Sequence, residues 1–190
     1  NNVQGSCDMG ALPGQFPGYQ SVEDPEIRAK FEKAWGVEKL PGKKGIPITE
    51  VGHNIEEGKI RAVYLFGEDP FQTEPDLAAV RRAYAKLDLF IAQDIFMTKS
   101  VAEADVVFPA TSWGEHEGVY SAADRGFQRF YKAIEPRGDV KPDWEIHSLM
   151  ATAMGYPMKY NNTQEIWDEM RDLRKNGWPG LCAMALQNAG

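Results

Sequence analysis

The stretch that decides the fold runs from Arg61 to Pro109 and reads RAVYLFGEDPFQTEPDLAAVRRAYAKLDLFIAQDIFMTKSVAEADVVFP. Three short, almost wholly apolar runs within it predict buried β-strands at residues 61–66, 88–92 and 105–109. The stretches between these runs predict helices at residues 74–87 and 98–104. Strands and helices that alternate at these lengths are typical of a parallel sheet with right-handed crossovers. The sequence therefore predicts an α/β fold, an open, mostly parallel, Rossmann-like sheet with flanking helices.

The segment before this stretch, residues 1–58, is expected to pack on the sheet as a loop followed by helices. Gly and Pro recur through residues 1–25, which predicts a long irregular loop. Two helices are expected after it, at residues 25–35 and 49–57. Asp24 is the predicted N-cap of the first helix and Thr49 that of the second.

The segment after the stretch is expected to complete the fold. We predict, in chain order, a loop, an extended segment and two helices, at residues 111–124, 127–134, 142–155 and 163–176, with Thr163 as the cap of the last helix. An apolar tail, residues 178–190, follows. The expected organisation is therefore residues 1–58 as the N-terminal part, 59–160 as the α/β core and 161–190 as a C-terminal helix and tail.

Composition excludes several classes of protein. The chain has 190 residues, 21 Lys and Arg against 28 Asp and Glu, and a formal net charge of −7. An acidic chain without a basic cluster is poorly suited to binding nucleic acid, because neutralised phosphates supply most of that affinity. No run approaches the roughly 20 apolar residues of a membrane span. The first ten residues lack the basic and apolar regions of a signal peptide. Because position 1 is Asn and not Met, we expect the chain to start within a longer reading frame or to have been processed.

Cysteine usage argues against a metal or iron–sulfur site built by this chain alone. Its two cysteines, Cys7 and Cys182, lie far apart and form no CxxC pair. Free thiols suit a reducing compartment, so a cytoplasmic location is expected.

Acidic and polar side chains follow the predicted strands at the points where the strands end. Because ligands of open parallel sheets bind beyond the carboxyl ends of the strands, carboxylates from the three loops are expected at one edge: Glu68, Asp69, Asp94, Glu115 and Glu117. Carboxylates there can bind metal, act as acid or base, or accept hydrogen bonds from a base or sugar. A carboxylate suits the N1–H and N2–H₂ donors of guanine. The alternative for Asp69 and Asp94 is that they only cap the helices that follow.

Other catalytic patterns are absent from the sequence. It contains no GxxxxGK[ST], no GxGxxG and no GxSxG, which excludes a P-loop, an ordinary dinucleotide-binding turn and a nucleophile elbow. Of the three histidines, His53 and His147 are expected to be structural or surface residues. His116 lies between Glu115 and Glu117, but adjacent side chains of an extended segment point apart. A metal site at this triplet is therefore not expected.

Four stretches together resemble the catalytic subunit of molybdopterin-dependent formate dehydrogenases, within the molybdopterin oxidoreductase family. They are NNVQGSCDMG at 1–10, GEDP at 67–70, QDIFMTKSVAEADVVFPATSWGEHEGVYSAADRGFQ at 93–128 and NNTQEIWDEMR at 161–171. The resemblance implies that this segment binds a molybdopterin guanine dinucleotide, mainly at its guanosine end. The metal would be Mo or W, and the whole enzyme would interconvert formate and CO₂ and pass electrons to iron–sulfur clusters.

The resemblance also implies which residues contact the dinucleotide. Glu68 takes the place of a polar nucleotide contact, Gln93 and Asp94 match the pair that holds the guanine or ribose, and Asp143 matches a further contact. His116 stands where relatives often have Lys. The full expected set is Gly67, Glu68, Asp69, Gln93, Asp94, Thr98, His116 and Asp143.

The family's catalytic residues have no counterpart here. A metal-bound Cys or selenocysteine followed by His, the nearby Arg and the four-Cys motif of the 4Fe-4S cluster are not found in the sequence. We therefore assign no catalytic residue and no metal ligand to this chain, and expect its partners to be the remaining domains of a parent subunit and iron–sulfur subunits. Two alternatives remain open: a scaffold that has lost the cofactor, and a free-standing nucleotide-binding module.

Overall fold

The structure, a computed structural model, describes residues 3–122 and 126–173. It divides into two compact units. The first comprises Asn1–Gly45, Glu117–Tyr131 and Tyr160–Gly190, and the second comprises Ile46–His116 and Lys132–Lys159. No helix in the described part of the chain is long and apolar enough to cross a membrane.

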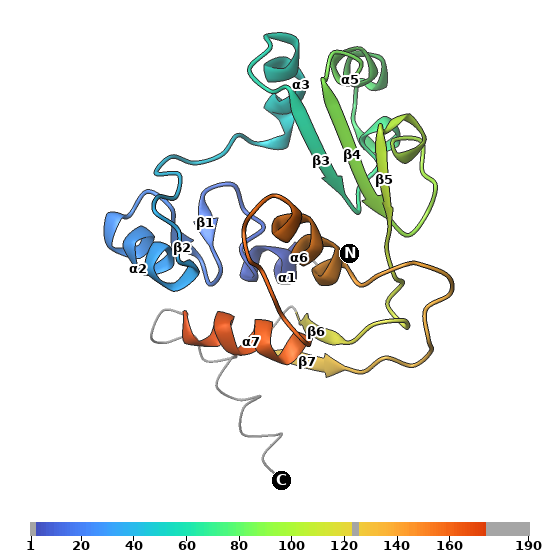
Figure 1. The fold of residues 1–190 in the computed structure, drawn as a ribbon. Helices are drawn as coiled ribbons and strands as arrows, with labels where there is room; N and C mark the ends of the chain where they lie inside the picture. Colours follow the sequence, from blue (N-terminus) through green and yellow to red (C-terminus); the bar gives the residue numbers. More distant parts are fainter. Residues whose placement is uncertain (1–2, 123–125, 174–190) are drawn as a thin grey trace. The chain divides into compact units, whose positions relative to one another are not determined.

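A three-stranded parallel sheet forms the centre of the second unit (Figure 1). The unit contains, in chain order, α3 (Ile48–Glu56), β3 (Ala62–Phe66), α4 (Pro70–Thr73), α5 (Leu77–Tyr84), β4 (Leu89–Asp94), the 3₁₀ turn η1 (Val101–Glu103), β5 (Val106–Pro109) and α6 (Asp143–Ala153). The strands lie in the order β3-β4-β5. The open parallel α/β fold expected from the sequence is confirmed.

One face of this sheet carries the apolar core. Alternate residues of the strands contribute Leu65, Phe90 and Ala92, which pack against α3, α4, α5 and η1. Phe71 and Tyr84 complete an aromatic cluster with Phe90, with ring centroids 5.1–6.2 Å apart. Because these rings are at most 9% exposed, this layer holds the helices on the sheet.

The other face of the sheet meets α6. The ring of His147 on α6 lies 5.5 Å from Tyr64 and 5.2 Å from Phe66, centroid to centroid. Tyr64 also packs edge-on against Phe108 of β5. The residues of β3 that point away from the apolar core, Tyr64 and Phe66, therefore pack against α6.

The first unit combines helices with two short hairpins. It contains α1 (Val3–Asp8), β1 (Gln15–Phe16), β2 (Gln20–Ser21), α2 (Pro25–Trp35), β6 (Gly118–Ser121), β7 (Phe127–Phe130) and α7 (Thr163–Asp172). α2 begins as predicted, because Asp24 accepts hydrogen bonds from the backbone N–H groups of Glu26 and Ile27. It ends at Gly36, whose φ of 62° is in the left-handed region that glycine adopts without strain. Phe31 stacks on Phe16 at 4.3 Å.

Several local predictions in the first unit were wrong. Residues 1–25 are not one irregular loop, since α1 and the β1–β2 pair occupy much of them. The expected extended segment 127–134 forms a strand only to Phe130, where pairing with β6 ends. The last helix is capped by Asn162 and not by Thr163, because the Asn162 side chain accepts from Glu165 N–H. The apolar tail at 178–190 lies outside the described residues.

Boundaries in the second unit also needed correction. α3 begins at Ile48 with Pro47 as its N-cap, so Thr49 lies inside the helix. The helix expected at 74–87 is shorter, α5 at Leu77–Tyr84, because Glu74 and Asp76 are not helical and Asp76 caps α5, and α4 lies before the predicted range. The helix expected at 98–104 is only the single turn η1.

Candidate functional site

The carboxyl ends of β3, β4 and β5 lie at the same edge of the sheet, because the strands are parallel and pair in register (Figure 1). Gly67 directly follows β3 and has a φ of 64°, and its N–H donates to the carbonyl of Gln93 at 2.9 Å. Glycine is favoured here because a side chain is strained in this left-handed conformation. Glu68 follows it and is exposed.

Gln93, near the end of β4, is a buried polar residue of this edge, with 1% of its surface exposed. The hydroxyl of Tyr64 on β3 donates to its Oε1. Its Nε2 donates to Asp143 Oδ1 at 2.7 Å. The amide therefore links β3, β4 and the start of α6 through both of its polar atoms.

Asp143 is the first residue of α6, where the helix dipole favours a negative charge. The N-cap of α6 is Pro142 and makes no side-chain hydrogen bond. The carbonyl of Asp143 lies 2.7 Å from His147 Nδ1, so Nδ1 is the protonated ring nitrogen, since a carbonyl can only accept. His147 thus has the structural role that was expected for it.

The pKa of Tyr64 is raised, first by burial and then by the negative charge of Asp143. A phenol is already protonated at neutral pH, and this shift widens the margin, so Tyr64 can donate to Gln93. In the apolar core, burial raises the pKa of Tyr84 as well, with a smaller contribution from Glu74.

Asp94 ends β4 and shapes its own loop. Its Oδ1 accepts a hydrogen bond from Phe96 N–H at 3.0 Å, an Asx turn and not a helix cap. Since Phe90 and Ala92 point into the apolar core, alternation places Asp94 on that face of the sheet and Gln93 on the opposite face. The pair therefore reaches the edge from both faces.

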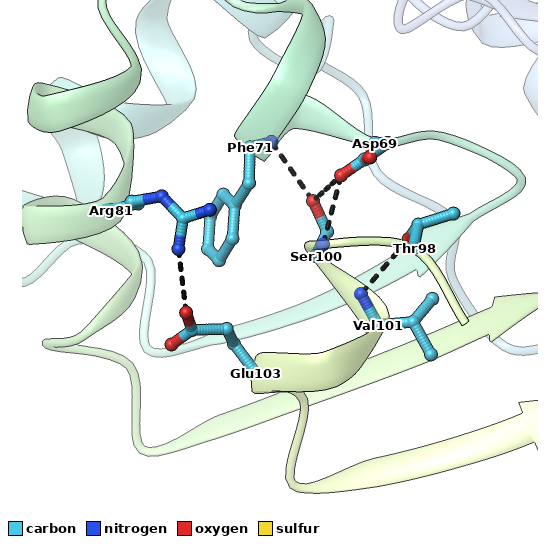
Figure 2. A network of polar contacts seen from close by, with 7 residues as sticks. All are labelled: Asp69, Phe71, Arg81, Thr98, Ser100, Val101 and Glu103. Atoms are coloured by element: carbon cyan, nitrogen blue, oxygen red, sulfur yellow. Dashed lines mark hydrogen bonds and ion pairs between the residues drawn. The ribbon is translucent and has the colours of Figure 1, made fainter.

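Asp69 joins the loops that follow β3 and β4 (Figure 2). Its Oδ1 accepts from the backbone N–H of Ser100 at 3.0 Å and from the Ser100 hydroxyl at 2.6 Å. The same hydroxyl accepts from Phe71 N–H at 3.0 Å. Asp69 is the N-cap residue of α4 but makes no side-chain capping bond to it. Thr98 Oγ1 in turn accepts from Val101 N–H at 3.2 Å.

The triplet around His116 does not gather at one point. His116 Nδ1 lies 3.1 Å from the Thr111 hydroxyl, and Glu115 accepts from Ser112 N–H at 2.9 Å. Glu117 belongs to the first unit, where it accepts from the Thr163 hydroxyl. Within residues 3–122 and 126–173, no group of three or more His, Cys, Asp or Glu could hold a metal ion.

A cavity of about 420 Å³ lies between α3 and α5. Its walls include Ile48, His53, Glu74 and Val80, and none of the predicted dinucleotide contacts. We therefore place the candidate site at the strand ends, where the polar groups converge.

Two residues of this edge escaped the sequence reasoning, Tyr64 and Ser100. Tyr64 stood inside a run that was interpreted only as a buried strand. A hydroxyl in such a strand, in phase with the polar Gln93 of the next one, is the signal that could have revealed it. Ser100 gave no comparable signal, because its partners are separated from it by 31 and 29 positions in the chain.

The sequence profile of molybdopterin oxidoreductases matches residues 1–153. The chain belongs to the molybdopterin oxidoreductase family. Formate dehydrogenase H of Escherichia coli is 64% identical over 173 residues, 91% of this chain and 24% of that protein. The putative formate dehydrogenase YrhE of Bacillus subtilis is 44% identical over 91% of this chain and 18% of its own length. The chain thus spans a quarter or less of these relatives.

One solved structure has a similar fold. Acetylene hydratase from Pelobacter acetylenicus superposes with a TM-score of 0.59 at 19% identity, covering 75% of this chain and 21% of that one. At that identity the likeness concerns the fold alone.

Membership of the molybdopterin oxidoreductase family implies a molybdopterin cofactor with molybdenum. The hydrogen-bond acceptors at the strand ends fit the organic part of such a cofactor. Asp94 and Asp143 carry carboxylates, and each has one oxygen engaged by a protein N–H. Such acceptors suit a ligand that presents N–H or O–H donors.

Proposed function

We propose that this chain binds the guanosine end of a molybdopterin guanine dinucleotide, through the α/β core at residues 59–160. The observation that carries the proposal is the pair of half-buried carboxylates at the strand ends, Asp94 at the end of β4 and Asp143 beside Gln93. The residues proposed to form or support the site are Gly67, Glu68, Asp69, Gln93, Asp94, Thr98, His116 and Asp143.

Guanine matches this acceptor-rich edge better than adenine does. Guanine presents two neighbouring donors, N1–H and N2–H₂, which a carboxylate can accept together. Adenine presents a lone pair at N1, which a carboxylate repels. The ribose hydroxyls of either nucleoside can donate to a second carboxylate. The edge therefore favours a guanine nucleotide by its base.

The parent enzyme is proposed to be a formate dehydrogenase that interconverts formate and CO₂. The relatives named above as formate dehydrogenases support this assignment. The bound cofactor, with Mo or W, supplies the two-electron chemistry. This chain's residues bind and orient the nucleotide end, and formate oxidation by the chain alone is not expected.

The partners of the chain belong to the same proposal. They are the remaining domains of the subunit and iron–sulfur electron-transfer subunits, where the 4Fe-4S clusters would lie. A cytoplasmic location is also proposed, because Cys7 is a free thiol.

Nuclear magnetic resonance titration of the ¹⁵N-labelled chain tests the nucleotide assignment. GDP should shift resonances of the strand-end loops and saturate, and ADP should bind at least about tenfold more weakly, the worth of a charge-assisted hydrogen bond. Asp94→Asn should weaken GDP binding by a similar factor. It keeps an oxygen for Phe96 N–H, so the loop stays folded.

Asp88→Asn is the matched control, because Asp88 is exposed just before β4, at the opposite end of that strand, and pairs with Arg61. Its GDP affinity should equal that of the unsubstituted chain. Equal affinity for GDP and ADP, or no shift at the strand ends, would contradict the proposal and favour the scaffold alternative.

A further inference from the structure

Burial closes the amide of Gln93 to a ligand, and each of its two polar atoms already has a protein partner. Its surface is 1% exposed, its oxygen accepts from Tyr64 and its nitrogen donates to Asp143. A base or ribose that approached the edge would reach the carboxylate of Asp143 and not this amide. The contact with the nucleotide that the resemblance implies for Gln93 is therefore better explained as an indirect one.

Tyr64 and Asp143 together determine which way the amide of Gln93 faces. With the phenol O–H donating to Oε1, the Nε2 group points at Asp143 and donates to it. The flipped amide would place Oε1 against the Asp143 carboxylate, two acceptors in contact, which is strongly unfavourable in a buried site. A phenol is protonated at neutral pH, and the raised pKa of Tyr64 widens that margin.

The orientation of Asp143 follows from these bonds. Oδ1 is held by Gln93, and the backbone carbonyl is held by His147 Nδ1. The ring of His147 packs on both Tyr64 and Phe66, so α6 is fixed against β3 beside the same hydroxyl. Among the described residues, none donates a hydrogen bond to Oδ2 of Asp143 in the structure, and the residue is half-buried.

We propose that Tyr64 and Gln93 are positioning residues, which hold the Asp143 carboxylate to accept the N1–H and N2–H₂ donors of guanine. This inference rests on the proposed function and deepens it. It identifies Asp143 as the residue that reads the base, Gln93 as its support without contact to the nucleotide, and Tyr64 as the residue that fixes the support. Oδ1 retains a lone pair for a second donor while it accepts from Gln93.

The test compares GDP with IDP, whose base lacks the N2 amino group. The unsubstituted chain should prefer GDP by about tenfold, the worth of one charge-assisted hydrogen bond. In Tyr64→Phe and Gln93→Leu the ratio of GDP to IDP affinity should fall toward one, because the Asp143 carboxylate is no longer held in the orientation that accepts from the guanine base. A purely structural loss would weaken GDP and IDP alike and leave the ratio unchanged.

Tyr84→Phe is the matched control, since Tyr84 is a buried tyrosine in the apolar core on the other face. It should retain the full GDP-to-IDP ratio. A second readout needs no nucleotide: the Gln93 side-chain N–H₂ should exchange with solvent slowly in the unsubstituted chain and faster in Tyr64→Phe, whose backbone spectrum reports that it is folded.

The outcomes separate the two proposals. A chain that prefers GDP over ADP and IDP, but keeps that preference in Tyr64→Phe and Gln93→Leu, would overturn the positioning role and leave the proposed function standing. A chain that binds GDP, ADP and IDP equally would overturn the proposed function, and with it the reading of guanine by Asp143. Unchanged exchange of the Gln93 amide in Tyr64→Phe would show that the phenol does not fix it.

Discussion

Asp69 accepts two hydrogen bonds from Ser100, one from its backbone N–H and one from its hydroxyl, through a single carboxylate oxygen. The two residues follow different strands, β3 and β4, so the bonds join the loops that border the candidate site. The Ser100 hydroxyl also accepts from the backbone N–H of buried Phe71, the first ring of the apolar core. The loop geometry and the core are therefore connected at one fully buried serine.

Ser100→Ala should destabilise the chain by about 1–3 kcal/mol, because it leaves the N–H of Phe71 buried without an acceptor and removes one bond to Asp69. Urea denaturation followed by circular dichroism measures this change. Ser6→Ala, at an exposed serine of α1, is the control and should stay within about 0.5 kcal/mol. Equal midpoints for the two variants would mean that the buried serine contributes nothing.

Phe90→Ala should be far more damaging, with a loss of about 3–5 kcal/mol. The ring is 4% exposed and contacts Tyr84 and Phe71 at centroid distances of 5.1 and 6.2 Å. Its removal leaves a cavity under α4 and α5 that these rings cannot fill. Thermal unfolding checks the prediction, with Phe96→Ala, at a ring that is 71% exposed, as the comparison that should change little.

Asp24→Ala should cost about 1 kcal/mol, since it removes the cap of α2. Asp24→Asn should recover most of this loss, because an amide oxygen can accept from Glu26 and Ile27 N–H in the same way. The midpoint of urea unfolding distinguishes the two variants. If both were destabilised alike, the negative charge and not the capping bonds would be the cause.

We expect Glu165, at the start of α7, to make the stability of the fold depend on pH. Its carboxylate accepts from the backbone N–H and the side-chain amide of Asn161, which lower its pKa from the ordinary 4.5. A carboxyl with a lowered folded-state pKa stabilises the fold above its ordinary value, and loses that contribution as the pH falls through the folded value. The stability advantage of the unsubstituted chain over Glu165→Gln should therefore shrink from about pH 6 to about pH 3. An advantage independent of pH would contradict the assignment.

The strand–helix alternation from Arg61 to Pro109 was readable because each strand is short, apolar and followed by a polar loop. The sheet, its parallel order and the edge with Asp94 followed from that pattern. Helix boundaries were less accessible: Glu74 looked like the start of one helix, but the chain turns between α4 and α5 before Asp76 caps the second. Tertiary contacts determine where a helix is interrupted in this way, and local helix propensity does not indicate it.

The contacts within the candidate site were beyond sequence reasoning for a similar reason. Gln93 and Asp143 are separated by 50 positions, and Tyr64 and Gln93 by 29. Nothing local in either segment indicates which amide atom faces which partner. Asp69 was weighed as a helix cap or a ligand contact, and the structure gives it a third task, the bonds to Ser100.

The two faces of β3 and β4 have a consequence for how such a protein can change. Val63, Leu65, Phe90 and Ala92 determine whether the helix layer holds, whereas Tyr64 and Gln93, interleaved with them, point to the other side. Neighbouring positions in one strand are thus under different selection, one for packing of the helix layer and the other for the polar contacts on the opposite face. Ligand preference can therefore change, by evolution or by design, at alternate residues while the apolar layer remains intact. An insertion of one residue would turn the apolar side chains to the polar face and the polar side chains to the apolar face.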